Sequence, residues 1–417
     1  MENGLTESTL AEVCSLVTDG THDTPTRVAS GFPLIKAKEI TGGRIDFENC
    51  DHISEKEHRE VIARSKPEFG DTLFAHIGAS LGEAAFVNTT REFSIKNVAL
   101  FKPKPAVVDA RYLYYLVISP AFQALAKGTK TGSAQPFLGL SQLRGHCIQY
   151  HRDLATQRRI GSILSAYDEL MENSQRCIRL LEAMARALYR EWFVHFRFPG
   201  SHAAAGAKAD GHQKIKMVDS PLGKIPHGWQ VKTVKDLATV TYGFPFQSQK
   251  FNTDGIGTPV IRIRDILDGS INTFTDEEAE PKYHIKDGDI LVGMDGDFHM
   301  GIWSSGHAFQ NQRVAKFESD GEIGNYHLFL ALELPIQTWN KSIVGTTVAH
   351  LGDMHIKTIQ IVWPPAKILA KAREILEPMS QQIIALKRQI QNLRRTRDLL
   401  LPRLLSGQVE LTTQTAN

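Results

Sequence analysis

The chain carries the same unusual segment twice. Residues 31–45 read GFPLIKAKEITGGRI, and residues 257–271 read GTPVIRIRDILDGSI. Glycine, proline and isoleucine recur at matching places, and so do two basic residues followed by an acid. This repeat limits the chain to folds that contain the same structural unit twice.

Further matches follow in the same order along the chain. They pair FGDTL at 69–73 with DGDIL at 287–291, NVALF at 97–101 with RVAKF at 313–317, and FLG at 137–139 with HLG at 350–352. A period above 200 residues is too long for a solenoid or propeller repeat. The 417 residues are also too many for one ordinary core. The sequence therefore predicts a tandem duplication of a complete domain with its appendage.

Each copy begins with a globular part of short β-rich runs bounded by Gly, Asp and Pro, and then continues as a long helix. The predicted fold class is α+β with an α/β-like character, two tandem globular domains each followed by a long helix. The predicted boundaries are a first domain at 1–154, a helix at 155–198, a linker at 199–228, a second domain at 229–371, a helix at 372–407 and a tail at 408–417.

Apolar residues repeat with a heptad period in both helical segments and in the same phase. Sustained spacing of this kind predicts a coiled-coil seam. The seam residues are Ile160, Leu164, Tyr167, Met171, Ile178, Leu181 and Leu188 in the first helix and Met379, Ile383, Leu386, Ile390, Leu393, Leu400 and Leu404 in the second.

An alternative for these helices is that each packs only on its own domain. Ser174 and Arg397 are expected to weaken the seam locally. Pro378 either kinks the second helix or marks its start.

Composition excludes several classes of protein. The sequence has no GxxxxGK[ST], no HExxH, no Asn/Asp-Pro-Pro-Tyr/Phe and no zinc-spaced Cys/His set, so we expect no catalytic and no metal site. Four dispersed cysteines, no signal peptide and no apolar run long enough to span a bilayer suggest a cytoplasmic protein. Net charge is +2, but the globular parts are slightly acidic, with 17 basic and 18 acidic residues in 1–154 and 13 and 17 in 229–371.

Two clusters resemble metal or acid–base sites. One is DGTHD at 19–23, and the other holds Asp295, Asp297 and His299. Asx-rich turn chemistry is the simpler interpretation of both. The counterpart of Asp295 in the first copy falls near Ile77, which argues against a duplicated catalytic site.

Three stretches resemble the specificity subunit of type I restriction–modification systems. They are DSPLGKIPHGW at 219–229, DLATQRRIGSIL at 153–164 and LPRLLSGQVEL at 401–411. The order globular–helix–globular–helix agrees with this family over nearly the whole chain. The sequence departs from the pattern at 370–373, which reads AKAR, and at the N-terminus, which lacks a GKIPHGW equivalent.

The resemblance implies a non-catalytic DNA reader without a cofactor of its own. Each globular part would be a target-recognition domain for one half of a bipartite asymmetric DNA sequence. The helices would pair as an antiparallel coiled coil and set the spacing. The implied partners are double-stranded DNA, two methyltransferase subunits and, for restriction, two motor–nuclease subunits, which would use S-adenosylmethionine, ATP and Mg. About 33 helical residues span roughly 50 Å, which is enough to bridge the roughly 34 Å of one DNA turn.

Candidate DNA contacts are the duplicated basic pairs, the polar residues at 96–97 and 310–313, and two Gly/Thr-rich loops, because such side chains bind phosphates and base edges. They are Lys36, Lys38, Lys96, Asn97, Lys127, Lys130, Thr131, Ser133, Gln135, Arg262, Arg264, Gln310, Asn311, Gln312, Arg313, Thr346, Thr347 and His350.

Two other functions remain open at this point, a coiled-coil scaffold that binds only protein and a stand-alone DNA methyltransferase. The missing catalytic motifs argue against the methyltransferase. The arginines of the second helix, from Arg388 to Arg403, favour a solvated or docking face over a DNA face.

Overall fold

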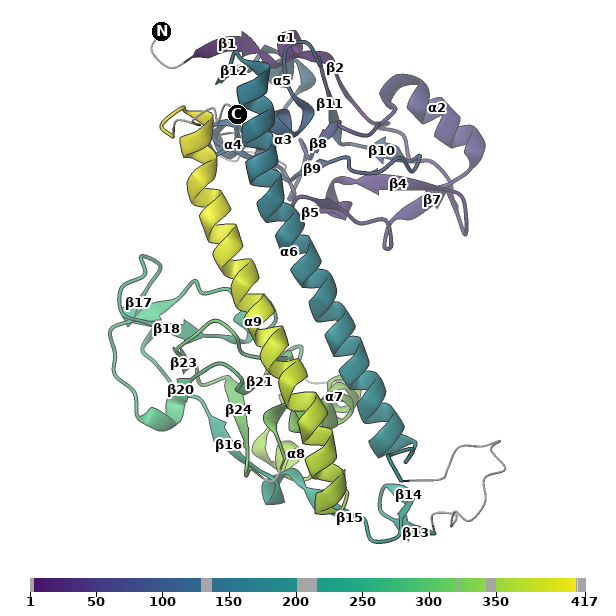
Figure 1. The fold of residues 1–417 in the computed structure, drawn as a ribbon, viewed down its shortest axis with the longest axis vertical. Helices are drawn as coiled ribbons and strands as arrows, with labels where there is room; N and C mark the ends of the chain where they lie inside the picture. Colours follow the sequence, from purple (N-terminus) through teal and green to yellow (C-terminus); the bar gives the residue numbers. More distant parts are fainter. Residues whose placement is uncertain are drawn as a thin grey trace, which may run out of the picture. The chain divides into compact units, whose positions relative to one another are not determined.

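The computed structural model describes residues 4–128, 137–200, 216–321, 323–342, 350–409 and 411 (Figure 1). The chain divides into two compact units, Met1–Met171 with Asn392–Asn417, and Glu172–Gln391. Two long helices belong to both units. Helix α6 (Leu154–Tyr189) begins in the first unit, and helix α9 (Ala366–Leu405) begins in the second.

The first unit combines small sheets with short helices. Its sheets have the strand orders β1-β12, β10-β4-β7-β3, β2-β11-β8-β9 and β5-β6. The strands are β1 (Leu5–Thr9), β2 (Cys14–Asp19), β3 (Arg27–Val28), β4 (Phe32–Lys36), β5 (Ile40–Thr41), β6 (Arg44–Ile45), β7 (Asp51–Ile53), β8 (Thr72–Phe74), β9 (Ala84–Phe86), β10 (Ser94–Lys96), β11 (Ala99–Pro103) and β12 (Cys147–His151). The helices are α1 (Leu10–Val13), α2 (Glu55–Ser65), α3 (Ala110–Ile118), α4 (Pro120–Gly128) and α5 (Leu140–Gly145).

The second unit repeats this arrangement with an added hairpin. Its sheets have the orders β13-β14, β15-β25, β16-β24-β21-β22 and β17-β19-β18-β23-β20. The strands are β13 (Met217–Ser220), β14 (Gly223–Pro226), β15 (Gln230–Thr233), β16 (Ala238–Tyr242), β17 (Phe251–Asn252), β18 (Thr258–Ile261), β19 (Phe274–Thr275), β20 (His284–Ile285), β21 (Ile290–Gly293), β22 (Met300–Ile302), β23 (Ala308–Gln310), β24 (Val314–Ser319) and β25 (Gln360–Trp363). The helices are α7 (Asn325–Ser342) and α8 (Asp353–Lys357).

The two units share most of their topology, although the second has the extra strand β20 and, among its described residues, no counterpart of the sheet β5-β6. The antiparallel sheet β2-β11-β8-β9 has its counterpart in β16-β24-β21-β22. The parallel pair β4–β10 has its counterpart in β18–β23. Each unit also has a strand pair next to a long helix. Strand β1 pairs with β12, which precedes α6, and strand β15 pairs with β25, which precedes α9. The α+β class and the duplicated domain are thus confirmed.

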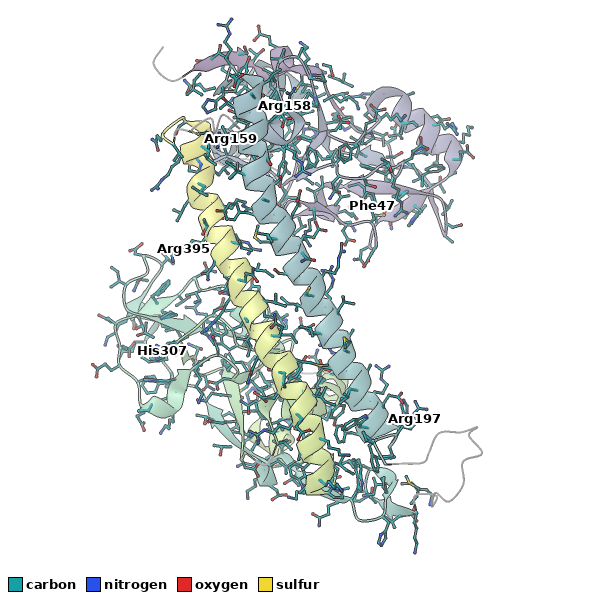
Figure 2. The ribbon with its side chains drawn as sticks, in the orientation of Figure 1. Phe47, Arg158, Arg159, Arg197, His307 and Arg395 are labelled. Carbon is teal, nitrogen blue, oxygen red and sulfur yellow. The ribbon has the colours of Figure 1, made fainter. Side chains whose placement is uncertain are left out.

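The start of α6 is fixed by side chains of the DLATQRRI motif. Asp153 Oδ2 accepts hydrogen bonds from the backbone N and the Oγ1 of Thr156, at 2.8 and 2.7 Å, and so caps the helix. Gln157 is fully buried and donates from Nε2 to the carbonyls of Val107 and His151. Of the two arginines that follow, Arg158 is exposed (Figure 2). The motif therefore joins the domain to the helix.

The end of α6 is fixed by aromatic packing. A π-helical turn at Arg190–Val194 follows the helix. Phe193, Phe196 and Phe198 then surround Trp229, with ring centroids 6.1, 5.4 and 5.3 Å away. Trp229 closes the DSPLGKIPHGW segment and is only 6% exposed. This segment therefore anchors the second domain to the end of α6.

The long helices pair antiparallel in both units. In the first unit, Leu164 of α6 shares a core with Leu404 of α9. In the second unit, Ala185 of α6 shares a core with Leu376 of α9. An early part of α6 thus meets the end of α9 in one unit, and a late part of α6 meets the start of α9 in the other. The predicted coiled coil has this polarity.

The residues of the predicted seam all lie at least partly in the interior. The buried ones are Ile160, Leu164, Met171, Ile178, Ile383 and Leu404. The half-buried ones are Tyr167, Leu181, Leu188, Met379, Leu386, Ile390, Leu393 and Leu400. Arg397 does not leave an unpaired charge in the seam, because its Nη1 lies 2.5 Å from Asp168 Oδ1 of α6.

Three boundaries differ from the prediction. Helix α6 ends at Tyr189, and its π-helical turn at Val194, instead of 198. Helix α9 begins at Ala366 instead of 372 and continues through Pro378. The hairpin β13–β14 falls inside the expected linker 199–228, so regular structure begins well before Trp229. Short polar hairpins lack a strong apolar period, so the sequence pattern predicts a linker at β13–β14.

Candidate nucleic-acid interface

The duplicated KAKE and RIRD segments form the same capped turn in both domains. The strands β4 and β18 end at Lys36 and Ile261, and a 3-10 turn follows each of them. The backbone N of Lys36 donates to Glu39, at 3.0 Å, and the backbone N of Arg262 donates to Asp265, at 2.9 Å. The repeated acid is therefore a buried cap.

The two basic residues of each segment do not lie on one strand, because the second of them falls in the turn. Lys38 and Arg264 lie in the turns, where they pair with the buried acids Glu39 and Asp265 while remaining exposed. Lys36 is largely buried and pairs with Asp51. The Arg262 guanidinium lies 4.8 Å from the centroid of Phe251. Lys38 and Arg264 are thus the accessible members of each pair. Burial raises the pKa of Asp265 despite its cap.

The polar residues at 96–97 are held in the first domain by local hydrogen bonds. Lys96 Nζ donates to Thr24 Oγ1 at 2.5 Å. Asn97 has a left-handed backbone, with φ 53°, and its Oδ1 lies 2.8 Å from His22 Nδ1. The other ring nitrogen of His22, Nε2, lies 2.9 Å from Asp19. Asn97 is therefore an oriented amide at the end of β10.

Gln310 differs most from its predicted role. It is fully buried, and its Nε2 donates to the carbonyls of Thr241 and Val314, both at 2.7 Å. It replaces the buried Ile95 of the first domain, because Phe244 N bonds the Gln310 carbonyl as Thr21 N bonds the Ile95 carbonyl. Its side chain cannot reach a base. Asn311 is 8% exposed, whereas Gln312 and Arg313 are exposed.

The predicted loops fall largely outside the described residues. Lys127 lies near the end of α4. The residues outside the described ranges are Lys130, Thr131, Ser133, Gln135, Thr346 and Thr347. His350 is described and lies directly before α8.

Three side chains of the second domain meet where β21, β24 and the segment before α8 come together. Arg313 Nε lies 3.1 Å from Asp295 Oδ2, and His350 Nδ1 lies 2.6 Å from Asp295 Oδ1. Asp295 and His350 also form an antiparallel backbone bridge. We call Asp295, Arg313 and His350 the DRH cluster. Asp297 and His299 are outside it, because His299 contacts the Ile263 carbonyl instead.

The same backbone bridge exists in the first domain with different side chains. Ile77 pairs there with Phe137, and Leu138 N donates to the His76 carbonyl as Leu351 N donates to that of Met294. Phe137 is 53% exposed. Sequence matching aligns Asp295 with the region of Ile77, and His350 with Phe137. It does not show that the two residues of each domain meet. Equivalent surfaces are thus apolar in one domain and charged in the other.

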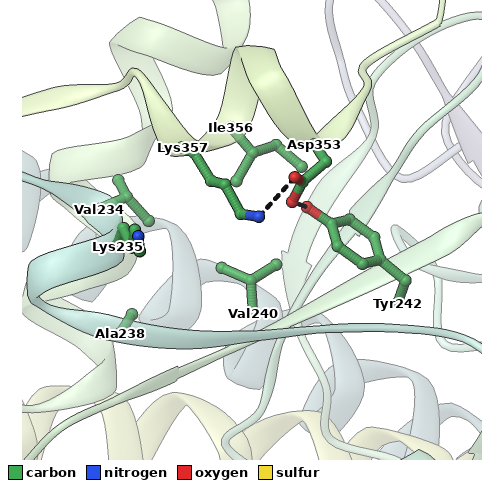
Figure 3. A pocket seen from close by; sticks show the side chains of 8 residues that line it. All are labelled: Val234, Lys235, Ala238, Val240, Tyr242, Asp353, Ile356 and Lys357. Carbon is green, nitrogen blue, oxygen red and sulfur yellow. Dashed lines mark hydrogen bonds and ion pairs between the residues drawn. The ribbon is translucent and has the colours of Figure 1, made fainter.

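A shallow pocket of about 130 Å³ lies beside this region in the second domain (Figure 3). Asp353 is at its rim and accepts hydrogen bonds from Tyr242 Oη and Lys357 Nζ, both at 2.5 Å. The bond from Lys357, followed by that from Tyr242, lowers the pKa of Asp353. The other lining residues are Val234, Lys235, Ala238, Val240 and Ile356. No nucleophile–base pair is present among these eight.

No group of three or more His, Cys, Asp and Glu side chains within the described ranges is arranged to hold a metal ion. No helix in that part of the chain is long and apolar enough to cross a membrane.

Comparison with known proteins gives consistent matches. Residues 226–394 match the family described as "Type I restriction modification DNA specificity domain". The type I restriction enzyme MjaIX specificity subunit of Methanocaldococcus jannaschii is 26% identical, covering 92% of this chain and 91% of that protein. The EcoBI specificity subunit of Escherichia coli is 31% identical, covering 45% and 41%.

A solved structure shares the fold. The S subunit of a type I restriction–modification system from M. genitalium aligns with a TM-score of 0.59 and 15% identity, covering 99% of this chain and 98% of that one. Residues 226–394 therefore match the type I restriction–modification DNA specificity domain, and the chain is similar along nearly its whole length to a specificity subunit of such a system.

Proposed function

We propose that this chain is the DNA-reading subunit of a type I restriction–modification complex, with each globular domain reading one half of a bipartite asymmetric target. The observation that carries the proposal is the pair of equivalent bridges. One backbone arrangement presents Ile77 and Phe137 in the first domain, and Asp295 and His350 in the second. A shared scaffold with different surface chemistry is suited to reading two different half-sites.

The chain itself contributes recognition and no catalysis. We propose that two methyltransferase subunits dock on α6 and α9, and that two motor–nuclease subunits join for restriction. These partners would supply the chemistry that depends on S-adenosylmethionine, ATP and Mg. Both globular domains carry a small net negative charge. The partners therefore provide much of the positive charge around DNA, and the isolated chain binds DNA weakly.

The test is to co-express the chain with its candidate methyltransferase and to map methylated adenines by long-read sequencing. A split asymmetric motif with a fixed unread gap is the expected result. A stable complex that modifies no such motif would contradict DNA reading and favour a scaffold that binds only protein.

A further inference from the structure

Arg313 and its two partners are arranged to read a specific base. This inference rests on the proposed function, because it assumes that the second domain faces DNA. We propose that Arg313 reads a guanine in the half-site of the second domain, and that Asp295 and His350 are the residues that position it.

The geometry leaves the correct edge of Arg313 available. Asp295 Oδ2 binds the Nε side of the guanidinium at 3.1 Å. Within the described part of the chain, no hydrogen-bond partner lies on the terminal Nη1 and Nη2 atoms, and the side chain is 56% exposed. Two parallel donors at the end of an arginine match the O6 and N7 acceptors of guanine in the major groove.

Asp295 is itself held in place, as a positioning residue requires. Its two oxygens are occupied by different partners, Arg313 and His350. Its backbone bridges His350, and the neighbouring Met294 N donates to the Arg313 carbonyl at 3.0 Å. Met294, the residue before Asp295, is thus hydrogen-bonded through its backbone to Arg313 and to Leu351, the residue after His350. An arginine that is oriented in advance loses less conformational entropy when it binds a base.

The duplication marks this place as variable while its surroundings stay the same. Asn97 occupies the position of Arg313 in the first domain, because Gly20 N bonds the Val98 carbonyl as Gly243 N bonds the Val314 carbonyl. The capped turns on the same sheets keep their acids, Glu39 and Asp265. The backbone changes here as well, because one residue separates Ile95 from Asn97 and two separate Gln310 from Arg313, and Asn97 has a φ of 53°. Chemistry that changes between conserved strands is expected of residues that read sequence.

The experiment uses the full chain in complex with its methyltransferase partner and maps methylated motifs for the wild type and for Arg313→Ala, Arg313→Lys and Asp295→Ala. We expect one guanine position in one half-site to relax in all three variants, with discrimination falling about 5- to 150-fold, while the other half-site stays unchanged. Lysine keeps the charge but loses the two-pronged contact. His350→Gln retains a donor for Asp295 and is expected to keep the motif.

The matched control is Arg264→Ala. Arg264 is also exposed, and its Nε faces the carboxylate of Asp265 at 3.6 Å in the same domain. Its loss is expected to change efficiency at all sites alike and to leave the motif intact. A wild-type motif that survives Arg313→Ala at every position would overturn this inference but leave the proposed function standing. A wild-type complex that modifies no split motif would contradict the proposed function itself.

A second measurement needs no protein variant. The wild-type complex is titrated with duplexes carrying 7-deazaguanine, which lacks the N7 acceptor, at each guanine of the mapped motif in turn. Weakened binding at one guanine of a single half-site, about fivefold or more, supports the inference. Equal binding to every substituted duplex overturns it.

Discussion

Gly20 and Gly243 occupy the same place in the two domains, each directly against the backbone of a neighbouring segment. A Cβ at Gly20 would collide with the Ile95 carbonyl, and a Cβ at Gly243 would collide with the Asn311 carbonyl. Each glycine also donates from N to a valine carbonyl, Gly20 to that of Val98 at 3.0 Å and Gly243 to that of Val314 at 3.1 Å. The duplication therefore preserves a close approach of two backbones.

Replacing either glycine with alanine is expected to destabilise its own unit by about 3 kcal/mol or more, because backbone cannot move aside as a flexible side chain can. All five tryptophans, Trp192, Trp229, Trp303, Trp339 and Trp363, belong to the second unit. Urea unfolding followed by tryptophan fluorescence therefore reports Gly243→Ala, and circular dichroism reports Gly20→Ala.

Gly145→Ala is the control for this pair. Gly145 ends α5, has nothing within 4 Å of a built Cβ and lacks a positive φ. Alanine there is expected to be neutral or to stabilise by up to about 1 kcal/mol. Equal effects at Gly145 and Gly20 would show that the close approach is not what matters.

The Arg397–Asp168 pair is expected to specify how the helices meet in the first unit. Asp168 also accepts a hydrogen bond from Tyr115 Oη at 2.5 Å. Burial disfavours the charge of Arg397, but Asp168 outweighs it and raises the arginine pKa. Arg397→Ala is expected to cost up to about 3 kcal/mol by leaving Asp168 without its cation. The exposed pair Arg59–Glu55 is the control, and Arg59→Ala is expected to cost less than about 0.5 kcal/mol.

The stability of the second unit is expected to fall as the pH is lowered. Burial lowers the pKa of His327 to about 4, and its ring packs 4.5 Å from that of Phe193. The unfolded state takes up the proton near pH 6.5, so this contribution is complete above that pH and is lost as the pH falls towards 4. The loss is about 3 kcal/mol. Tryptophan-detected unfolding of the wild type and His327→Leu at pH 7 and pH 4 measures it. Parallel pH dependence in both proteins would exclude His327 as the cause.

Helix length is expected to set the gap between half-sites. Seven residues inserted after Met171 in α6 and after Gln391 in α9 would keep the heptad phase within both units. At 1.5 Å per residue the insertion adds about 10 Å, or roughly three base pairs of unread DNA. Methylation mapping measures the gap. An insertion of three residues, which breaks the phase, is the control and is expected to impair assembly. A well-folded heptad variant that keeps the wild-type gap would contradict the prediction that helix length sets this gap.

The parts of the fold that were predictable are those that leave periodic or repeated patterns. Heptads gave the seam from Ile160 to Leu404 because coiled-coil packing depends on spacing along one helix. Matching windows gave the second domain because duplication copies order as well as composition. The hairpin at Met217–Pro226 leaves no such pattern, and neither does the early start of α9 at Ala366.

Side-chain roles were less predictable because they depend on which segments, distant in the sequence, pack against each residue in the fold. Gln310 reads as a base-contacting amide in isolation, yet it fills the buried place of Ile95. Lys36 and Arg262 look alike in sequence, yet one pairs with Asp51 and the other with the ring of Phe251. The DRH cluster needs three separate segments, and only the fold brings them together.

The bridges Ile77–Phe137 and Asp295–His350 both join their strands through main-chain atoms, although the second also has a contact between its side chains. Because the main-chain bridge forms with either set of side chains, substitutions at these positions are expected to cost little stability and so to be tolerated. Such a protein can change the bases that it recognises one residue at a time while the backbone of each domain is retained. Its two domains can also diverge independently of each other.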